Sequence, residues 1–129
     1  MMPDQNRPNI LVVDDLPANL HSMKKLLEKL DVNIVLADSG NRALTLLLKD
    51  NFRLILLDVN MPIMDGYETA ELILQLDELE HMPIIFVTAH DKDHQHTFRE
   101  NTGRIDYIFK PIDADILINK VKSHLELLI

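Results

Sequence analysis

The chain alternates between two patterns of apolar and polar positions, and this alternation predicts five β-strands, each followed by a helix. Short, nearly continuous apolar runs are typical of strands that are buried on both faces of a sheet. Such runs occupy residues 9–13, 32–37, 54–57, 84–87 and 105–109. Between the runs, apolar residues recur at the three- and four-residue spacing of a helix. This order predicts a doubly wound α/β fold, with a five-stranded parallel sheet and five helices on its two faces.

Several of the expected helices begin at residues that favour helix starts. Pro17 suits the first turn of the first helix, and Ser39 and Asp65 are the expected N-caps of the second and third. The third helix is expected over 67–79, and the last runs from Asp113 toward the end of the chain. The helix residues expected to face the core are Leu20, Met23, Leu27, Leu30, Ala43, Leu44, Leu47, Leu48, Ala70, Ile73, Leu74, Leu76, Leu79, Ile116, Leu117, Val121, Leu125 and Leu128.

The fourth expected helix, over 91–103, has the weakest signal. Phe98 is its only large apolar residue among charges, histidines and asparagine. Because so little apolar surface is available for burial, we expect this helix to be loosely anchored to the sheet.

The composition is that of one folded domain. The 129 residues fit a single domain with a core over about 9–127, and they are also compatible with one module of a longer protein.

The net charge of −8 argues against direct contact with nucleic acid, which needs a basic surface. No apolar run approaches the length of a membrane span and no signal-peptide pattern is present, so we expect a cytoplasmic location without membrane contact. The absence of cysteine excludes disulfides and thiolate metal sites.

Polar residues that suit phosphate chemistry follow four of the five strands. Asp14 and Asp15 follow the first strand, Asp58 the third, Thr88 the fourth and Lys110 the fifth. The carboxyl ends of parallel strands meet at one edge of the sheet, where α/β folds bind their ligands. Clustered carboxylates need protons or a cation, and oxygen ligands favour Mg²⁺. A metal and a lysine around a carboxylate suit phosphoryl transfer, in which the aspartate itself is the nucleophile.

The joint pattern resembles the response regulator receiver domain of two-component signalling. The residues that carry the resemblance are V-D-D after the first strand, L-D-V-N-M-P-I-M-D-G after the third, T-A after the fourth and D-Y-I-F-K-P after the fifth. It covers about 9–127 and implies a flavodoxin-like sheet with strand order 2-1-3-4-5. By this resemblance Asp58 is the phosphoacceptor. The implied Mg²⁺ ligands, with Mn²⁺ as a possible substitute ion, are the carboxylates of Asp14, Asp15 and Asp58 and the backbone carbonyl of Asn60.

The resemblance also implies how the phosphoryl group is held and how it acts. Lys110 would pair with Asp58 and then with the phosphoryl group, and the Lys110-Pro111 bond would be cis. Thr88 would bind the phosphoryl group, and with Tyr107 it would form a switch pair that reshapes the surface of the fourth helix, fifth strand and fifth helix. Asn60 and His90 would tune the lifetime of the phosphate.

The partners implied are a histidine kinase or a histidine phosphotransfer protein that presents phosphohistidine. The domain would assist its own phosphorylation and dephosphorylation, but it would not be an enzyme. A kinase or other catalytic domain is compatible with a longer parent protein. The apolar stripe of the last helix is compatible with a covalent output domain or with a homodimer.

Other functions agree less well with these residues. A receiver-like interaction module without phosphorylation stays open, although the complete acid, Thr and Lys set argues against it. An aspartate-nucleophile, Mg²⁺-dependent phosphohydrolase usually needs D-x-D after the first strand, where this chain has D-D-L-P. A flavin or nucleotide site needs a glycine-rich loop there, and none is present. A calcium loop fails because Ile63 and Thr69 occupy its glycine and glutamate positions.

Overall fold

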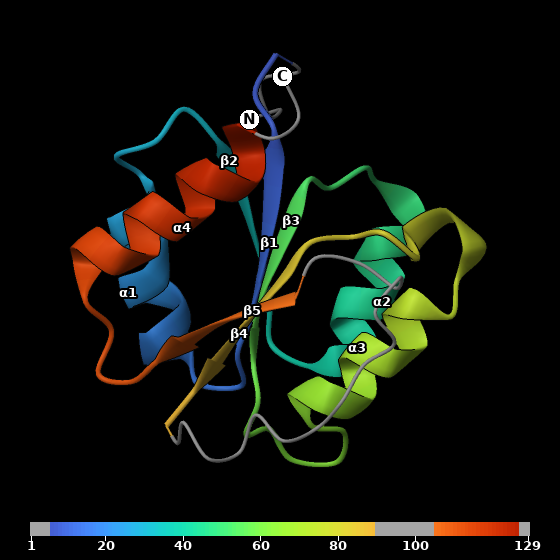
Figure 1. The fold of residues 1–129 in the computed structure, drawn as a ribbon. Helices are drawn as coiled ribbons and strands as arrows, with labels where there is room; N and C mark the ends of the chain where they lie inside the picture. The colour runs from blue at the N-terminus through green and yellow to red at the C-terminus, as the bar shows by residue number, and fades with distance from the viewer. Residues whose placement is uncertain (1–5, 90–104, 127–129) are drawn as a thin grey trace.

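The computed structural model describes residues 6–89 and 105–126 (Figure 1). Within them lies one five-stranded sheet of order β2-β1-β3-β4-β5, and all four strand pairings are parallel. The flavodoxin-like strand order expected from the sequence is therefore confirmed. The strands are β1 (Asn9–Val13), β2 (Asn33–Ala37), β3 (Leu54–Asp58), β4 (Ile84–Thr88) and β5 (Ile105–Phe109).

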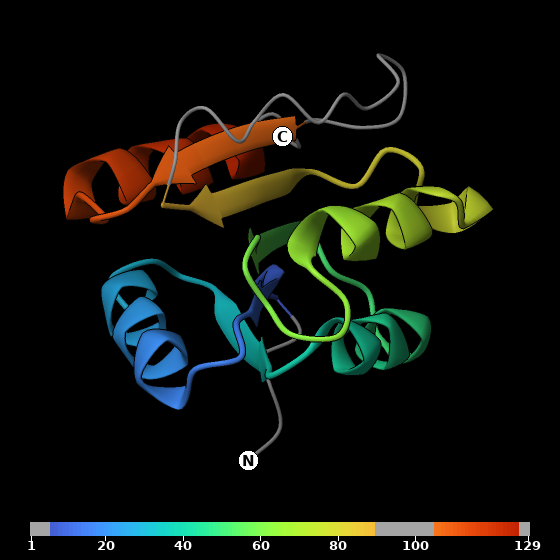
Figure 2. The same cartoon turned by 90° about the horizontal axis from the view of Figure 1, so that it is seen from below.

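Four α-helices cover the two faces of the sheet in the described part of the chain. Figures 1 and 2 show α1 and α4 on one face and α2 and α3 on the other. The expected helix over 91–103 lies outside the described residues. No helix in residues 6–89 and 105–126 has the length and apolar character needed to cross a membrane. The helices are α1 (Pro17–Leu27), α2 (Gly40–Lys49), α3 (Gly66–Leu74) and α4 (Ala114–Glu126), with a 3₁₀ helix η1 (Asp77–Leu79).

The sheet divides the apolar core into two clusters because successive side chains on a strand point to opposite faces. On β3, Ile55 and Leu57 belong to the cluster under α2 and α3, whereas Leu54 and Leu56 belong to the cluster under α1 and α4. Every residue of β3 is buried. A central strand covered on both faces needs apolar residues at every position, which explains the unbroken run that predicted it.

Pro17 is the first residue of α1, as expected, and hydrogen bonds confirm the expected N-caps of α2 and α3. The Ser39 side chain accepts from the Arg42 amide at 3.0 Å. Asp65 and Glu68 form a reciprocal capping box at the start of α3. The Asp113 carboxylate accepts from two amides of the first turn of α4. These bonds satisfy amides that have no partner within their own helix.

The prediction that the third helix runs to residue 79 is wrong. Helix α3 ends at Leu74, and the chain passes through an extended Leu76 into η1. On a continuous helix Leu79 would lie about 140° around the axis from Leu74, away from the buried stripe. The break turns Leu79 back so that it packs against the first core cluster.

Two helix residues expected in the core are exposed instead. Leu48 is 71% exposed and Ile116 is 51% exposed. Each lies one position outside a stripe with four-residue spacing, Ala43 to Leu47 in α2 and Leu117 to Val121 in α4, so it points away from the sheet.

Smaller differences concern the ends of elements. Helix α1 ends at Leu27, so Leu30 lies beyond it, yet Leu30 still packs against the second core cluster. Strand β2 begins at Asn33, one residue after the expected start at the buried Val32. The expected core residue Leu128 lies outside the described residues.

Candidate functional site

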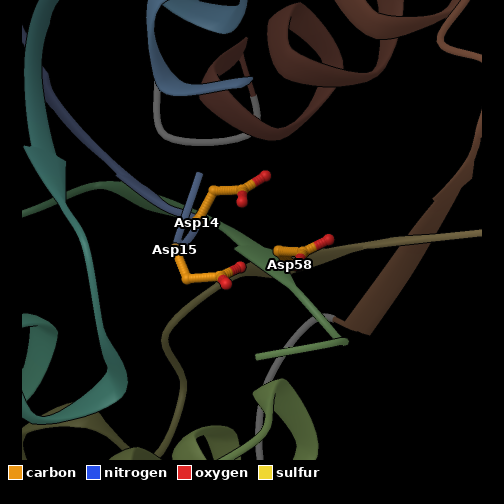
Figure 3. Close-up of side chains that lie close together, drawn as sticks. All are labelled: Asp14, Asp15 and Asp58. Atoms are coloured by element: carbon orange, nitrogen blue, oxygen red, sulfur yellow. The ribbon is translucent and has the colours of Figure 1, made fainter. Parts of the chain in front are cut away.

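Three carboxylates converge at the carboxyl edge of the sheet. One oxygen each of Asp14, Asp15 and Asp58 lies within 4.8 Å of the others. Figure 3 shows the three side chains leaving the ends of the neighbouring strands β1 and β3 and pointing in the same general direction. Asp14 and Asp58 are buried, and Asp15 is half-buried. The structure thus brings together the three acids that the sequence placed at strand ends.

Backbone hydrogen bonds position the acids. The Asp14 amide donates to the Ala37 carbonyl at 3.1 Å, which extends the pairing of β1 and β2 by one residue. The Asp14 carboxylate then accepts from the Leu16 amide at 3.0 Å. Asp58 is the last residue of β3, and the following Val59 donates its amide to the Val87 carbonyl at 3.0 Å. Both carboxylates are therefore attached to backbone that the sheet holds in place.

The loop after β3 returns so closely that it requires a glycine. The Gly66 amide donates to the Val59 carbonyl at 2.8 Å. A Cβ added at Gly66 would lie 2.3 Å from the Asp58 carbonyl oxygen and 2.8 Å from Val59 Cα. These are backbone atoms, which cannot rotate away as a side chain can. The glycine of the M-D-G sequence thus lets α3 start against the backbone of Asp58.

Lys110 supplies the positive charge of the site. Its Nζ lies 3.0 Å from Asp58 Oδ1, and its side chain is one-third exposed. The Lys110 amide donates to the Thr88 carbonyl at 2.8 Å, which continues the pairing of β4 and β5. The Lys110-Pro111 peptide bond is cis, as the resemblance implied.

Among the described residues, the three carboxylates of the site carry more negative charge than Lys110 balances. Burial raises the pKa of Asp58, the hydrogen bond from Lys110 opposes this, and the charges of Asp14 and Asp15 raise the pKa further. The net shift is upward. A carboxylate with a raised pKa is one whose negative charge is destabilised, and a nearby cation would relieve it.

The donor set fits a hard divalent cation such as Mg²⁺. Carboxylate and carbonyl oxygens are the ligands this ion prefers, and three carboxylate oxygens already lie within reach of one another. Asn60, whose carbonyl is the fourth expected ligand, lies in the exposed loop two residues after Asp58.

A cavity of about 330 Å³ opens beside the carboxylates, between α1 and the loop that follows β5. Asp14, Asp58 and Lys110 line its polar end, and Met23 and Leu26 of α1 line its apolar part. Asp58 is itself only 3% exposed, and it is one of the polar residues that line this cavity.

Comparison with known proteins agrees with this arrangement. A family model described as the response regulator receiver domain matches residues 10–122. Chemotaxis protein CheY of Pseudomonas aeruginosa is 34% identical over 118 residues, which make up 91% of this chain and 95% of that protein. The chain belongs to the response regulator receiver domain family.

Receiver sequences similar to this chain also occur within longer proteins. Signal transduction histidine-protein kinase BarA of Escherichia coli K12 is 41% identical over 110 residues, which are 85% of this chain and 12% of that protein. A crystal structure of the signal receiver domain of a signal transduction histidine kinase from Syntrophus aciditrophicus superposes with a TM-score of 0.81 at 29% identity. The superposition covers 92% of this chain and 90% of the receiver domain in that crystal structure. The chain spans 12% of the length of BarA and 28% of the length of another long curated relative.

The two residues expected to form the receiver switch pair lie on neighbouring strands. Thr88 ends β4 and is fully buried. Tyr107 lies in β5 beside Phe86, and the two ring centroids are 5.5 Å apart. The Tyr107 ring is half-buried, and this burial raises the pKa of its phenol. His90, expected to tune the phosphate lifetime, lies outside the described residues.

One cluster of this receiver domain was missed by reasoning from the sequence. Asp106 of β5 accepts from Lys120 Nζ of α4 at 2.6 Å, and His124 Nε2 lies 3.2 Å from its other oxygen. Lys120 also donates to the Tyr107 carbonyl at 2.9 Å. We call Asp106, Lys120 and His124 the β5 clamp. The available signal was a polar residue within an apolar strand, together with Lys and His four residues apart on a helix.

The contacts within the β5 clamp favour the charged form of Asp106. Burial alone would raise the pKa of Asp106. Hydrogen bonds from Lys120, from the Tyr107 amide and from His124 outweigh it, so the pKa lies below its ordinary value. The clamp therefore contains a carboxylate that is stable as an anion beside the Lys120 ammonium.

Proposed function

We propose that this receiver domain is a phosphoacceptor in which Asp58 takes a phosphoryl group from a phosphohistidine donor. The observation that carries the proposal is the meeting of Asp58, Asp14 and Asp15 within 4.8 Å, with Lys110 Nζ 3.0 Å from Asp58. A nucleophilic carboxylate, two further acids and a fixed ammonium are the parts that phosphoryl transfer needs, because the reaction depends on positioning and charge neutralisation.

In the proposed step, one Asp58 carboxylate oxygen attacks the phosphorus of phosphohistidine. A P–O bond to Asp58 forms, the P–N bond breaks, and its electron pair leaves with the imidazole nitrogen. Asp14, Asp15, the Asp58 carboxylate and the Asn60 carbonyl would hold Mg²⁺, which supplies charge neutralisation at the phosphoryl oxygens. Lys110 first pairs with Asp58 and then with a phosphoryl oxygen.

The proposed response to phosphorylation uses Thr88 and Tyr107. The Thr88 hydroxyl would donate to a phosphoryl oxygen, and the Tyr107 ring would turn into the space that the hydroxyl leaves. Because β5 carries Tyr107 and α4 packs beside it, the surface of these elements would change with phosphorylation. The expected contribution of 91–103 to that surface stays a prediction, as do the roles of Asn60 and His90 in phosphate lifetime.

The partner proposed is a histidine kinase or a histidine phosphotransfer protein. BarA, which contains a similar sequence, is named as a histidine-protein kinase, and this supports a donor of that class. In this role the domain is a signalling phosphoacceptor that assists its own phosphorylation and dephosphorylation. An output domain, a homodimer and a cytoplasmic location stay predictions.

The test is intact-mass measurement after incubation with acetyl phosphate and Mg²⁺. We expect one added phosphoryl group that is lost on incubation with hydroxylamine, as acyl phosphates are. Asp58→Asn and EDTA should each abolish it. Asp50→Asn is the matched control, because it removes the same charge from an exposed position at the end of α2. If wild type forms no adduct and does not bind beryllofluoride, the phosphoacceptor proposal fails and the interaction-module alternative replaces it.

A further inference from the structure

The outer edge of β5 is held by side chains instead of by another strand of the described sheet. β5 is the last strand in the order β2-β1-β3-β4-β5. The Lys110 amide donates to Thr88 of β4, so its backbone faces inward. Backbone groups alternate in direction along a strand. The amide and carbonyl of Tyr107, three residues earlier, therefore both face outward.

The β5 clamp satisfies both of these outward groups. The Tyr107 amide donates to Asp106 Oδ1 at 2.8 Å, and the Tyr107 carbonyl accepts from Lys120 Nζ at 2.9 Å. Lys120 Nζ also donates to the same Asp106 Oδ1 at 2.6 Å, which joins the two bonds into one unit. His124 holds the other Asp106 oxygen from the next turn of α4. The clamp therefore holds the backbone of Tyr107 on the side that faces α4.

The ring of Tyr107 has a different environment from its backbone. It packs against the core cluster under α2 and α3, with its centroid 5.5 Å from Phe86 and 6.3 Å from Phe109. A ring rotation that reports phosphorylation needs a backbone that stays in place, because otherwise strand and ring would move together and two distinct ring positions would not be defined.

We propose that Asp106 and Lys120 are positioning residues, held in place by His124, that fix the Tyr107 backbone so that its ring switches between defined positions when Asp58 is phosphorylated. This inference rests on the proposed phosphoacceptor function. The clamp takes no part in the chemistry at Asp58, and α4 sets the position of the Tyr107 backbone.

The test compares Lys120→Met with Lys122→Met. Both remove one positive charge from α4 and keep a long apolar stem, but Lys122 is exposed and lies outside the clamp. Lys120→Arg is the conservative variant, because it keeps the charge and the donors. Ring-labelled tyrosine makes the readout direct, since the chain has only two tyrosines and Tyr67→Phe assigns the signals.

Three measurements follow, all on the full chain. In the absence of a phosphodonor, hydrogen exchange of the Tyr107 amide should be about tenfold faster in Lys120→Met than in wild type, because a charge-assisted network is lost. With beryllofluoride and Mg²⁺, the Tyr107 ring signal should move to a new position in wild type, Lys122→Met and Lys120→Arg. In Lys120→Met it should show one averaged position. In a separate reaction with acetyl phosphate and Mg²⁺, Lys120→Met should be phosphorylated at Asp58 at the wild-type rate.

Three results would overturn the inference. They are unchanged Tyr107 amide exchange in Lys120→Met, a wild-type ring response in that variant, and a folded Lys120→Met protein that is not phosphorylated, since Lys120 would then act in the chemistry. Absence of phosphorylation in wild type marks failure of the proposed function and removes the switch role with it. The amide exchange result separates the two failures, because it requires no phosphodonor.

Discussion

Replacing the Asp58 carboxylate should stabilise the protein when no metal is present. The ligand oxygens of Asp14 and Asp15 lie within 4.8 Å of that of Asp58, so at an effective dielectric constant of about 20 each of the two carboxylates repels Asp58 by at least about 3 kcal/mol. The attraction to Lys110 at 3.0 Å is about 5 kcal/mol on the same scale, before screening of a side chain that is one-third exposed. The desolvation cost of a carboxylate that is 3% exposed adds to the unfavourable side.

The two repulsions together exceed the attraction by about 1 kcal/mol, and desolvation adds to this difference, so Asp58→Asn should gain at least about 1 kcal/mol in unfolding free energy. Asparagine keeps the shape and can still accept from Lys110. The assay is urea denaturation at pH 7 in EDTA, with an unchanged m-value as evidence that the unfolded state is the same. Mg²⁺ should stabilise wild type more than Asp58→Asn, so the difference in unfolding free energy between the two proteins should become smaller.

The direction of the Asp58 pKa shift also determines how the stability difference between wild type and Asp58→Asn depends on pH. The pKa of Asp58 in the folded protein lies above its ordinary value of 3.8. The folded state therefore holds this proton more tightly than the unfolded state, and the contribution of Asp58 to wild-type stability falls as pH rises from 3.8 through the folded pKa. The advantage of Asp58→Asn in EDTA should grow over that interval and then stay constant.

Asp50→Asn serves as control, because it makes the same change in net charge at an exposed carboxylate. Its effect should stay within about 0.5 kcal/mol. A loss of stability for Asp58→Asn in EDTA would show that the carboxylates do not repel one another on balance. An equal gain in Asp50→Asn would also contradict this repulsion, since the effect would then reflect net charge and not the cluster.

Three further substitutions test local features of the structure. Gly66→Ala should lower the unfolding free energy by about 2 to 3 kcal/mol in urea denaturation, because its Cβ would lie 2.3 Å from the Asp58 carbonyl oxygen; no loss of stability would contradict the close packing. Ile63→Gly should raise it by about 1 kcal/mol, because Ile63 has φ 70° and a 99% exposed side chain; an unchanged stability would mean that the conformation is unstrained. Asp106→Asn should destabilise the protein above pH 3.8, and the difference from wild type should vanish as pH falls through the lowered pKa of Asp106. A difference that persists at lower pH would argue against charge as its cause.

Strand positions and the acid cluster were predictable because their signals are local. The buried run before Asp58 has no polar face, so it fits only a covered central strand, and the polar residues at strand ends must meet once the strands are parallel. The end of α3 was not predictable from spacing, because Leu76 and Leu79 are apolar and the helix pattern can be extended through them. Leu48 and Ile116 were misplaced because they neighbour buried residues in sequence while pointing elsewhere.

The sequence signal for the β5 clamp is too weak to specify its contacts, because these depend on how α4 is rotated and placed against the sheet. Asp106 alone is compatible with a turn, a surface or an ion pair, and Lys120 and His124 alone are compatible with a solvated helix face. Only the packed structure shows that one carboxylate serves an amide, a lysine and a histidine together.

The two-residue period of β5 explains how one strand can serve both the acid cluster and α4. Side chains at Asp106, Ile108 and Lys110 share one face of the strand, where the first meets α4 and the last reaches Asp58. Tyr107 points to the opposite face and packs with Phe86. Because ring and clamp occupy opposite faces, the ring can move without breaking a clamp bond. An aromatic residue one position earlier or later on β5 would point to the face that carries the clamp. Its ring would then meet α4, and ring and clamp would no longer be on separate faces.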